Sequence, residues 1–263
     1  MKNLSIVIPV FNESKRIQKT FEALKTLKLS RGLKLQEIIF VNDGSTDNSL
    51  KRLKTFAMYS KLPIKVISYS NNRGKGYAVK KGMLASSSPY TLLCDADMST
   101  PFSELVKFEK ALTNNIDIIL GTRKNGHSTV VIHQPKYREI LGKVFTKITQ
   151  KSLGLDVTDF TCGFKLFSRG SIEAIFPFTI IDRWGYDAEI VYLAAKNNLT
   201  IKEVPVLWSD DKGSHVNVFV AAPQTLIELG RILALHSFLP FITSISVVKT
   251  SVAYTTKLTE FLL

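Results

Sequence analysis

Two aspartates, Asp95 and Asp97, stand two positions apart directly after the apolar run at residues 90–94. Carboxylates with this spacing at the end of a strand can share one divalent cation, because Mg²⁺ and Mn²⁺ prefer oxygen ligands and commonly bridge to substrate phosphates. An Asp-x-Asp triplet on its own is more often part of an ordinary solvated loop. A metal-binding pair of this kind would support group transfer from a nucleotide-bearing donor. Whether Asp95 and Asp97 form such a pair depends on the elements that position them.

Apolar runs alternate with helical patterns along most of the chain. Strands are expected near residues 4–10, 37–41, 64–68, 90–94, 116–120, 163–168 and 201–207, and helices near 13–28, 46–60, 74–86, 102–114, 136–152 and 186–197. This alternation is typical of βαβ units and predicts an α/β fold with a mostly parallel sheet flanked by helices. The early strands end at acidic or turn residues, which is where such sheets present their ligands.

Five short motifs follow one another on this framework. They are PVFNE at 9–13, VNDGSTD at 41–47, NRGKG at 72–76, DAD at 95–97 and GTR at 121–123. With these motifs the chain resembles the family 2 inverting glycosyltransferases, which have a GT-A fold. Residues 159–167 and 182–189 are similar to the branch of that family that transfers a sugar to a polyprenyl phosphate. The resemblance covers residues 4–215.

The resemblance implies a set of contacts to a nucleotide-sugar donor. Asp97 would be the direct ligand of a Mg²⁺ or Mn²⁺ ion, with Asp95 beside it and nearer the ribose. Asp43 would hydrogen-bond the base. The other donor contacts would come from Pro9, Phe11, Glu13, Lys75 and Ala96. The family usually has tyrosine at the position of Phe11, so a hydroxyl contact is missing there.

The resemblance also implies an acceptor site. Arg123, Arg138 and Lys165 would bind the acceptor phosphate, a task that suits guanidinium groups in particular. Asp159 and Asp187 are the candidate catalytic carboxylates, although either can instead position a neighbouring side chain. A phosphate monoester is mostly a dianion at pH 7 and barely needs a general base. The sequence leaves open which carboxylate matters.

The expected reaction is inverting transfer of glucose from UDP-glucose to a polyprenyl (dolichyl-type) phosphate. GDP-mannose is the alternative donor, because the motifs do not include the side chains that select the sugar. Transfer to a hydroxyl acceptor is a second alternative, and it would require Asp159 or Asp187 as a general base. A non-catalytic nucleotide-sugar sensor is disfavoured by the intact spacing of Asp95 and Asp97.

The net positive charge limits the classes of binding partner that are expected. The 263 residues include 35 basic and 22 acidic ones, a net charge of +13, which suits nucleic acid, an anionic membrane surface or phosphate-bearing substrates. No zinc-ligand spacing or RNA-binding aromatic motif occurs, so nucleic acid is not an expected partner. A membrane surface fits a lipid-phosphate acceptor. The first strand begins almost at Met1, which predicts no signal peptide and a place at the cytosolic face of a membrane.

The composition changes near the end of the chain. The expected organisation is a catalytic domain over residues 1–215 and a C-terminal apolar helical segment over 216–263. Residues 232–248 lack Asp, Glu, Lys and Arg, but these seventeen residues are short for a membrane span, which needs about 20. An interfacial helical segment that associates with a membrane, or a contact in a homo-oligomer, is expected instead. His215 is a further candidate metal ligand, although a lone loop histidine is usually just solvated.

Overall fold

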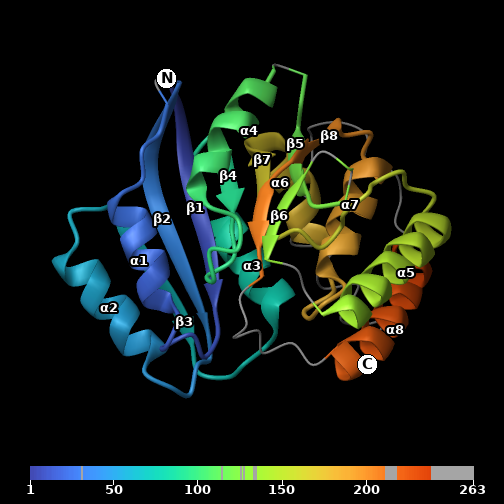
Figure 1. The fold of residues 1–263 in the computed structure, drawn as a ribbon, viewed down its shortest axis with the longest axis horizontal. Coiled ribbons are helices and arrows are strands. Elements are labelled where there is room, and N and C mark those ends of the chain that lie inside the picture. The colour runs from blue at the N-terminus through green and yellow to red at the C-terminus, as the bar shows by residue number, and fades with distance from the viewer. Residues whose placement is uncertain are drawn as a thin grey trace.

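A seven-stranded sheet forms the centre of the protein (Figure 1). The structure is a computed structural model, and it describes residues 1–30, 32–113, 115–124, 126, 128–132, 135–210 and 218–237. The strands are β1 (Lys2–Val10), β2 (Leu33–Asp43), β3 (Ile64–Tyr69), β4 (Tyr90–Leu93), β5 (Ile118–Thr122), β7 (Lys165–Ser168) and β8 (Ile201–Pro205). Their order is β3-β2-β1-β4-β7-β5-β8. The pairs are parallel except those of β7, which runs antiparallel to β4 and β5. The predicted mostly parallel sheet is confirmed.

Helices cover both faces of this sheet. They are α1 (Ile17–Lys25), α2 (Ser49–Tyr59), α3 (Lys75–Ala85), α4 (Leu105–Ala111), α5 (Lys136–Leu153), α6 (Arg169–Ile175), α7 (Tyr186–Lys196) and α8 (Val218–Ser237). Along β1, Leu4, Ile6 and Ile8 belong to the core beneath α1, α2 and α4, while Val7 belongs to the core beneath α3, α6 and α7. Successive side chains of a strand point to opposite faces, so a strand that is covered on both sides is apolar throughout.

The sheet brings three chain segments to one edge. β1 pairs in parallel with β2 on one side and with β4 on the other, so the carboxyl ends of these strands are neighbours. Phe11 and Asp95 lie just beyond β1 and β4, and Asp43 is the last residue of β2; the three belong to three of the motifs. A small parallel pair, β6 (Thr129–Ile132) with β9 (Leu207–Ser209), was not predicted as a separate sheet.

The C-terminal region is described only in part. Residues 218–237 form α8, which packs against α5 and α7. Within the described ranges no helix combines the length and apolarity that a membrane span requires. His215 and residues 238–248 lie outside the described part, and the boundary expected between residues 215 and 216 stays a prediction.

Candidate functional site

A cavity of about 810 Å³ opens at the sheet edge where β1, β2 and β4 end. The predicted site residues that line it are Pro9, Phe11, Glu13, Asp43, Lys75, Asp95, Ala96, Asp97, Arg123 and Asp187. Asp159 and Lys165 are fully buried and are not part of this lining. Arg138 belongs to α5, but its side chain lies outside the described part of the structure. The predicted donor residues and one predicted acceptor arginine therefore share one cavity.

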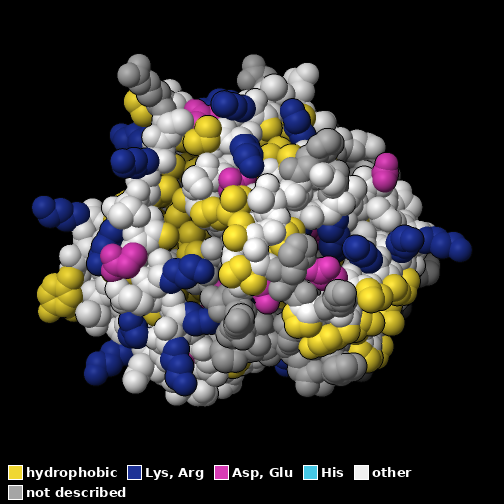
Figure 2. Space-filling model, in the orientation of Figure 1, with side chains coloured by type: hydrophobic (Ala, Val, Ile, Leu, Met, Phe, Trp, Pro, Cys, Tyr) yellow, Lys and Arg dark blue, Asp and Glu magenta, His cyan; other side chains and the backbone are white. Residues whose placement is uncertain are grey.

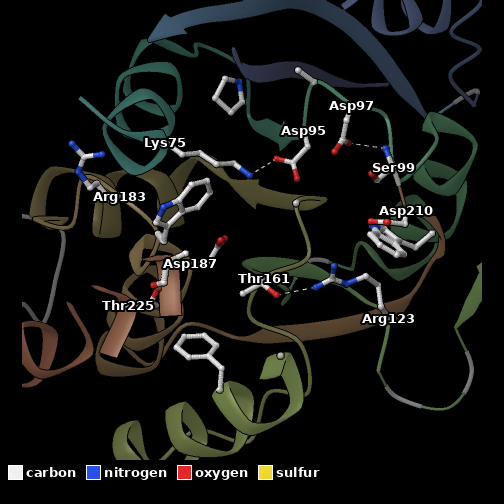
Figure 3. A pocket seen from close by; sticks show the side chains of 18 of the residues that line it. Lys75, Asp95, Asp97, Ser99, Arg123, Thr161, Arg183, Asp187, Asp210 and Thr225 are labelled. Atoms are coloured by element: carbon white, nitrogen blue, oxygen red, sulfur yellow. Dashed lines mark hydrogen bonds and ion pairs between the residues drawn. The ribbon is translucent and has the colours of Figure 1, made fainter. Parts of the chain in front are cut away.

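The two aspartates of the Asp-Ala-Asp triplet lie at one side of the cavity (Figure 3). The Nζ atom of Lys75 lies 2.6 Å from Oδ1 of Asp95, and Oδ1 of Asp97 accepts the backbone N–H of Ser99 at 2.9 Å. Burial alone would raise the pKa of Asp95, but Lys75 holds it below its ordinary value. Burial and the neighbouring Asp95 carboxylate raise the pKa of Asp97. Two crowded carboxylates of this kind are stabilised by a cation between them.

The donor set fits a metal ion that is shared with a substrate. Among the described residues, no three His, Cys, Asp or Glu side chains are grouped closely enough to hold a metal by themselves. Mg²⁺ is commonly held by one or two carboxylates together with substrate phosphates and water. Asp95 and Asp97 can supply the carboxylates, so the remaining ligands would be oxygens of a bound diphosphate and water.

Asp43 shapes the turn that carries Lys75 into the cavity. Its Oδ1 accepts the N–H of Arg73 at 2.8 Å, and its Oδ2 accepts the N–H of Gly74 at 2.9 Å and the side-chain amide of Asn72 at 2.8 Å. Gly74 has a φ of 112°, which an L side chain rarely adopts. Asp43 therefore holds the turn in place, and its contact with a nucleotide base stays a prediction.

Arg123 lies across the cavity from the two aspartates (Figure 3). Its Nε and Nη2 donate to the two carboxylate oxygens of Asp159 at 2.7 and 2.9 Å, and Nη2 also donates to Thr161 Oγ1 at 2.8 Å. Burial alone would raise the pKa of Asp159, but Arg123 and Lys124 hold it far below its usual range. Asp159 is thus an ionised partner that orients Arg123 from a buried position outside the cavity lining.

Asp187 and Lys165 form a second buried pair. The Nζ atom of Lys165 contacts Oδ1 of Asp187 and donates to the carbonyl of Cys162 at 2.7 Å. Burial raises the pKa of Asp187, and Lys165 only partly offsets this effect. Asp187 reaches the cavity, whereas Lys165 is fully buried behind it. The structure therefore gives Lys165 no access to an acceptor phosphate in the cavity, because its ammonium group is committed to Asp187 and Cys162.

Comparisons with known proteins now identify the family. The model of "Glycosyl transferase family 2" matches residues 5–176. The chain belongs to glycosyl transferase family 2. A dolichyl-phosphate beta-glucosyltransferase of Dictyostelium discoideum is 36% identical over 241 residues, 87% of this chain and 73% of that protein. The human protein of the same name is 31% identical over 229 residues, 83% of this chain and 71% of that protein.

A solved structure agrees on the fold. Glucosyl-3-phosphoglycerate synthase from Mycobacterium tuberculosis, crystallised with Mn²⁺, UDP-glucose and glycerol 3-phosphate, superposes with a TM-score of 0.64 at 18% identity. The match covers 91% of this chain and 82% of that one. The GT-A fold expected from the motifs is thereby confirmed, and this family 2 chain is a glycosyltransferase.

Substitution of Asp159 tests whether its ionised carboxylate stabilises the fold through the ion pair with Arg123. Asp159→Asn removes the fully buried carboxylate that pairs with Arg123, whose side chain is 16% exposed at the cavity. Breaking a buried ion pair typically costs about 3–5 kcal/mol of folding free energy, and the partial exposure of the guanidinium places this variant at the lower end of that range. Because the folded-state pKa of Asp159 is depressed, its stabilising contribution is complete above the unfolded pKa near 3.9 and is lost as the pH falls. We expect a large loss of stability at neutral pH, and a smaller difference from the unsubstituted protein at about pH 3. Denaturant titrations at both pH values measure this difference, and equal differences at both would contradict the assignment.

Helix α8 contributes to the same site from far along the chain. Ala221, Ala222 and Thr225 line the cavity, and Oε2 of Glu228 accepts the N–H of Gly185 at 2.7 Å. Gly185 directly precedes α7, the helix that carries Asp187. A second anchor joins His236 Nε2 to Oε1 of Glu189 at 2.7 Å, with both side chains fully buried.

Glu228→Ala should loosen the loop that precedes α7. The charged acceptor for the Gly185 N–H is lost, and hydrogen bonds to charged groups contribute about 1.5–3 kcal/mol. We expect a loss of stability in that range together with a raised KM for substrate. The matched control is Glu173→Ala, whose exposed ion pair with Arg169 should contribute less than about 1 kcal/mol. Thermal unfolding and steady-state kinetics on both variants provide the comparison, and equal effects would reject a specific role for Glu228.

Several cavity residues received no individual role in the sequence interpretation, although Thr161, Arg183 and Trp184 lie within the segments 159–167 and 182–189 that it singled out. Both tryptophans of the chain line the cavity, together with Lys124, Thr161, Arg183 and Asp210. The Arg123 guanidinium carbon lies 5.2 Å from the ring centroid of Trp208. A signal was present for Trp184, which follows Arg183 outside any apolar run, whereas Trp208 ends the apolar run at residues 204–208. Large aromatic side chains at such positions are typical of ligand sites.

Proposed function

We propose that this protein transfers glucose from UDP-glucose to a dolichyl-type polyprenyl phosphate at the cytosolic face of a membrane. The proposal is carried by one observation, the placement of Asp95 and Asp97 opposite Arg123 across a single cavity. One side suits a metal-bound diphosphate and the other suits an anionic acceptor. The names of the relatives from Dictyostelium and human support glucose and dolichyl phosphate in particular.

The reaction follows from where these charges lie. A phosphate oxygen of the acceptor, oriented by Arg123, attacks the anomeric carbon as the bond from that carbon to the UDP oxygen breaks. Asp97 and Asp95 would hold a divalent cation, which would supply positive charge to the leaving diphosphate. The acceptor is already mostly a dianion at pH 7, so this step transfers no proton to the protein. In-line attack inverts the configuration and converts an α-linked donor into a β-linked product.

The individual contacts are part of the proposal. Pro9, Phe11, Glu13, Asp43 and Ala96 would surround the nucleoside, and Lys75 would exchange its ion pair with Asp95 for one with a donor phosphate. Asp187 has access to the cavity and is the remaining candidate for a general base if the acceptor is a hydroxyl.

The test is a transfer assay on the full chain. Purified protein is incubated with Mg²⁺ or Mn²⁺, a short-chain polyprenyl phosphate, and radiolabelled UDP-glucose or GDP-mannose, and the lipid is then extracted. Label from UDP-glucose that is shown by NMR to be β-linked supports the proposal. If only GDP-mannose labels the lipid, the donor is GDP-mannose and not UDP-glucose. If UDP-glucose binds but no lipid is labelled, the assignment of a polyprenyl phosphate as the acceptor is rejected.

A further inference from the structure

Glu203 of β8 directs its carboxylate at one short segment of the chain, residues 158–159. Its Oε1 accepts the side-chain hydroxyl of Thr158 at 2.8 Å and the N–H of Asp159 at 3.2 Å. The N–H of Thr158 is shared between Oε1 and Oε2, at 3.0 and 3.1 Å. Glu203 is half-buried on β8, the last strand in the order of the sheet. One carboxylate from the end of the sheet thus holds two consecutive backbone N–H groups and a hydroxyl.

This use of a carboxylate stands out in so basic a chain. The sequence has 35 basic and 22 acidic residues, and Figure 2 shows basic side chains spread over one face of the molecule with few acidic ones among them. A half-exposed glutamate in such surroundings has many cations with which it could pair. Within the described part of the chain, the partners of Glu203 are instead the N–H groups and the hydroxyl of residues 158–159. Hydrogen bonds to an ionised acceptor are stronger than those between neutral groups, so Glu203 fixes the position of this segment.

The segment that Glu203 holds is the one that carries the partner of Arg123. Oδ2 of Asp159 accepts the backbone N–H of Arg123 at 3.1 Å and its Nε at 2.7 Å. A second link joins Oγ1 of Thr158 to Oγ1 of Thr122 at 2.8 Å. A hydroxyl has one proton, and that of Thr158 goes to Glu203, so Thr122 is the donor in this second link. The position of Arg123 is therefore joined to Glu203 by two routes, through Asp159 and through Thr158.

The register of the sheet brings Glu203 to this place. β8 pairs in parallel with β5, and Glu203 lies opposite Leu120 (Figure 1). β5 ends two residues later at Thr122, directly before Arg123. Both ends of the network are thus carried by one pair of strands. Strands hold side chains more precisely than loops do, so this pair is suited to orient a group at the cavity.

Anchoring matters here because Asp159 has a second cation within reach. Nζ of Lys124 lies 3.5 Å from Oδ1 of Asp159, and both Arg123 and Lys124 line the cavity. A shift of the backbone at residues 158–159 would change how the carboxylate is shared between these two cations. The guanidinium would then lose the bidentate contact that sets its orientation.

We infer that Glu203 is a positioning residue for the acceptor. Through Thr158 and Asp159 it holds the Arg123 guanidinium in the orientation in which it meets the anionic group of the acceptor. Glu203 is not among the described residues that line the cavity, so it acts on a substrate only through Arg123. The identity of that anionic group as a polyprenyl phosphate rests on the proposed function, whereas the orientation of Arg123 does not.

Three substitutions of Glu203 separate its length from its charge. Glu203→Gln keeps the length, and its amide oxygen can accept the bonds that Oε1 accepts, so kcat/KM for a short-chain polyprenyl phosphate should stay close to that of the unsubstituted protein. Glu203→Asp keeps the charge but is one methylene shorter, and Glu203→Ala removes the acceptor group. Both should lower kcat/KM for the polyprenyl phosphate by at least about tenfold, because the guanidinium is displaced. UDP binding in the presence of Mn²⁺, measured by calorimetry, should be unchanged in all three.

Glu37 provides the matched control. It is also a half-buried glutamate on a strand, β2, and its Oε1 accepts the N–H and the hydroxyl of Ser87 and the hydroxyl of Ser5, each at 2.8 Å. Glu37→Ala loses bonds of the same kinds and should leave kcat/KM unchanged. Melting temperatures show that each variant is folded, and if Glu203→Ala is too unstable to purify, Glu203→Asp against Glu203→Gln makes the same comparison. Losses in the Glu203 variants no larger than in Glu37→Ala, or an equal loss of UDP affinity, would overturn the inference.

Failure of the proposed function has a different signature. If the unsubstituted protein transfers no glucose to polyprenyl phosphate, the acceptor is wrong, and the orientation of Arg123 can still be measured by NMR of the arginine Nε–H groups. The Arg123 signal is identified by its loss in Arg123→Lys, and its hydrogen exchange should be slow because Nε donates to the fully buried Asp159. Exchange should be at least about tenfold faster in Glu203→Asp than in Glu203→Gln, because the ion pair opens more often. Equal exchange rates in these two variants would overturn the inference whatever the acceptor is.

Discussion

Asp97→Asn should reduce glucosyl transfer by at least about 10³-fold, because a metal ion that stabilises a leaving diphosphate contributes several kcal/mol and each 1.36 kcal/mol is a factor of ten. The amide has the shape of the carboxylate and can still accept the N–H of Ser99, the bond that Oδ1 of Asp97 makes at 2.9 Å. The local backbone should therefore be preserved while the negative charge is lost. Turnover with UDP-glucose and a short-chain polyprenyl phosphate measures the effect on the reaction.

Mn²⁺ binding separates this explanation from a general loss of structure. Calorimetry or electron paramagnetic resonance in the presence of UDP should show a much weaker Mn²⁺ affinity in Asp97→Asn, at an unchanged melting temperature. Asp156→Asn makes the same chemical change at an exposed position after α5 and should affect neither property. Retention of Mn²⁺ binding and turnover by Asp97→Asn would exclude Asp97 as the metal ligand.

The sequence was sufficient to predict the sheet edge that carries the donor side of the site. Parallel strands place their carboxyl ends at the same edge of a sheet, and the structure adds that β1 pairs with both β2 and β4, which makes Phe11, Asp43 and Asp95 neighbours. The apolar runs that end β1 and β2 are long and buried on both faces, which makes these two strands the most predictable of the three.

The acceptor side was less predictable, because burial there depends on pairing between distant segments. Lys165 lies within the motif segment 159–167 and looks like a phosphate ligand, but β7 pairs with both β4 and β5, and this buries its ammonium group against Asp187. Asp159 likewise looks catalytic until its partner Arg123, thirty-six residues away, is known. No local pattern records such contacts.

The contribution of α8 to the cavity could not be predicted from the sequence for a related reason. Its sequence is apolar and lies near the chain end, which predicts an independent helical segment. The structure places Thr225 in the cavity and Glu228 on the N–H of Gly185, forty-three residues earlier. A glutamate inside an apolar helix was the available signal, because a buried charged group needs a specific partner.

Gly163→Ala should lower kcat/KM by about 100-fold, because a catalytic group that is misplaced by about 1 Å can cost that much. A Cβ atom at position 163 would lie 1.9 Å from Oδ2 and 2.3 Å from Cγ of Asp95. Asp95 is paired with Lys75, so its carboxylate can retreat only by breaking that contact. Gly163 has no positive φ, so the alanine backbone itself is unstrained and the effect comes from displacing Asp95.

Gly170→Ala is the matched control for this steric argument. Gly170 lies in α6, and a Cβ atom built there meets no described atom within 4 Å. Alanine is favoured over glycine in a helix by about 0.5–1 kcal/mol, so this variant should be slightly more stable and fully active. Steady-state kinetics and melting temperatures of both variants distinguish the outcomes. If Gly163→Ala were as active as Gly170→Ala, the Asp95 carboxylate would be free to move, and the contact between the Cys-Gly-Phe-Lys segment and the Asp-Ala-Asp triplet would not set the geometry of the donor site.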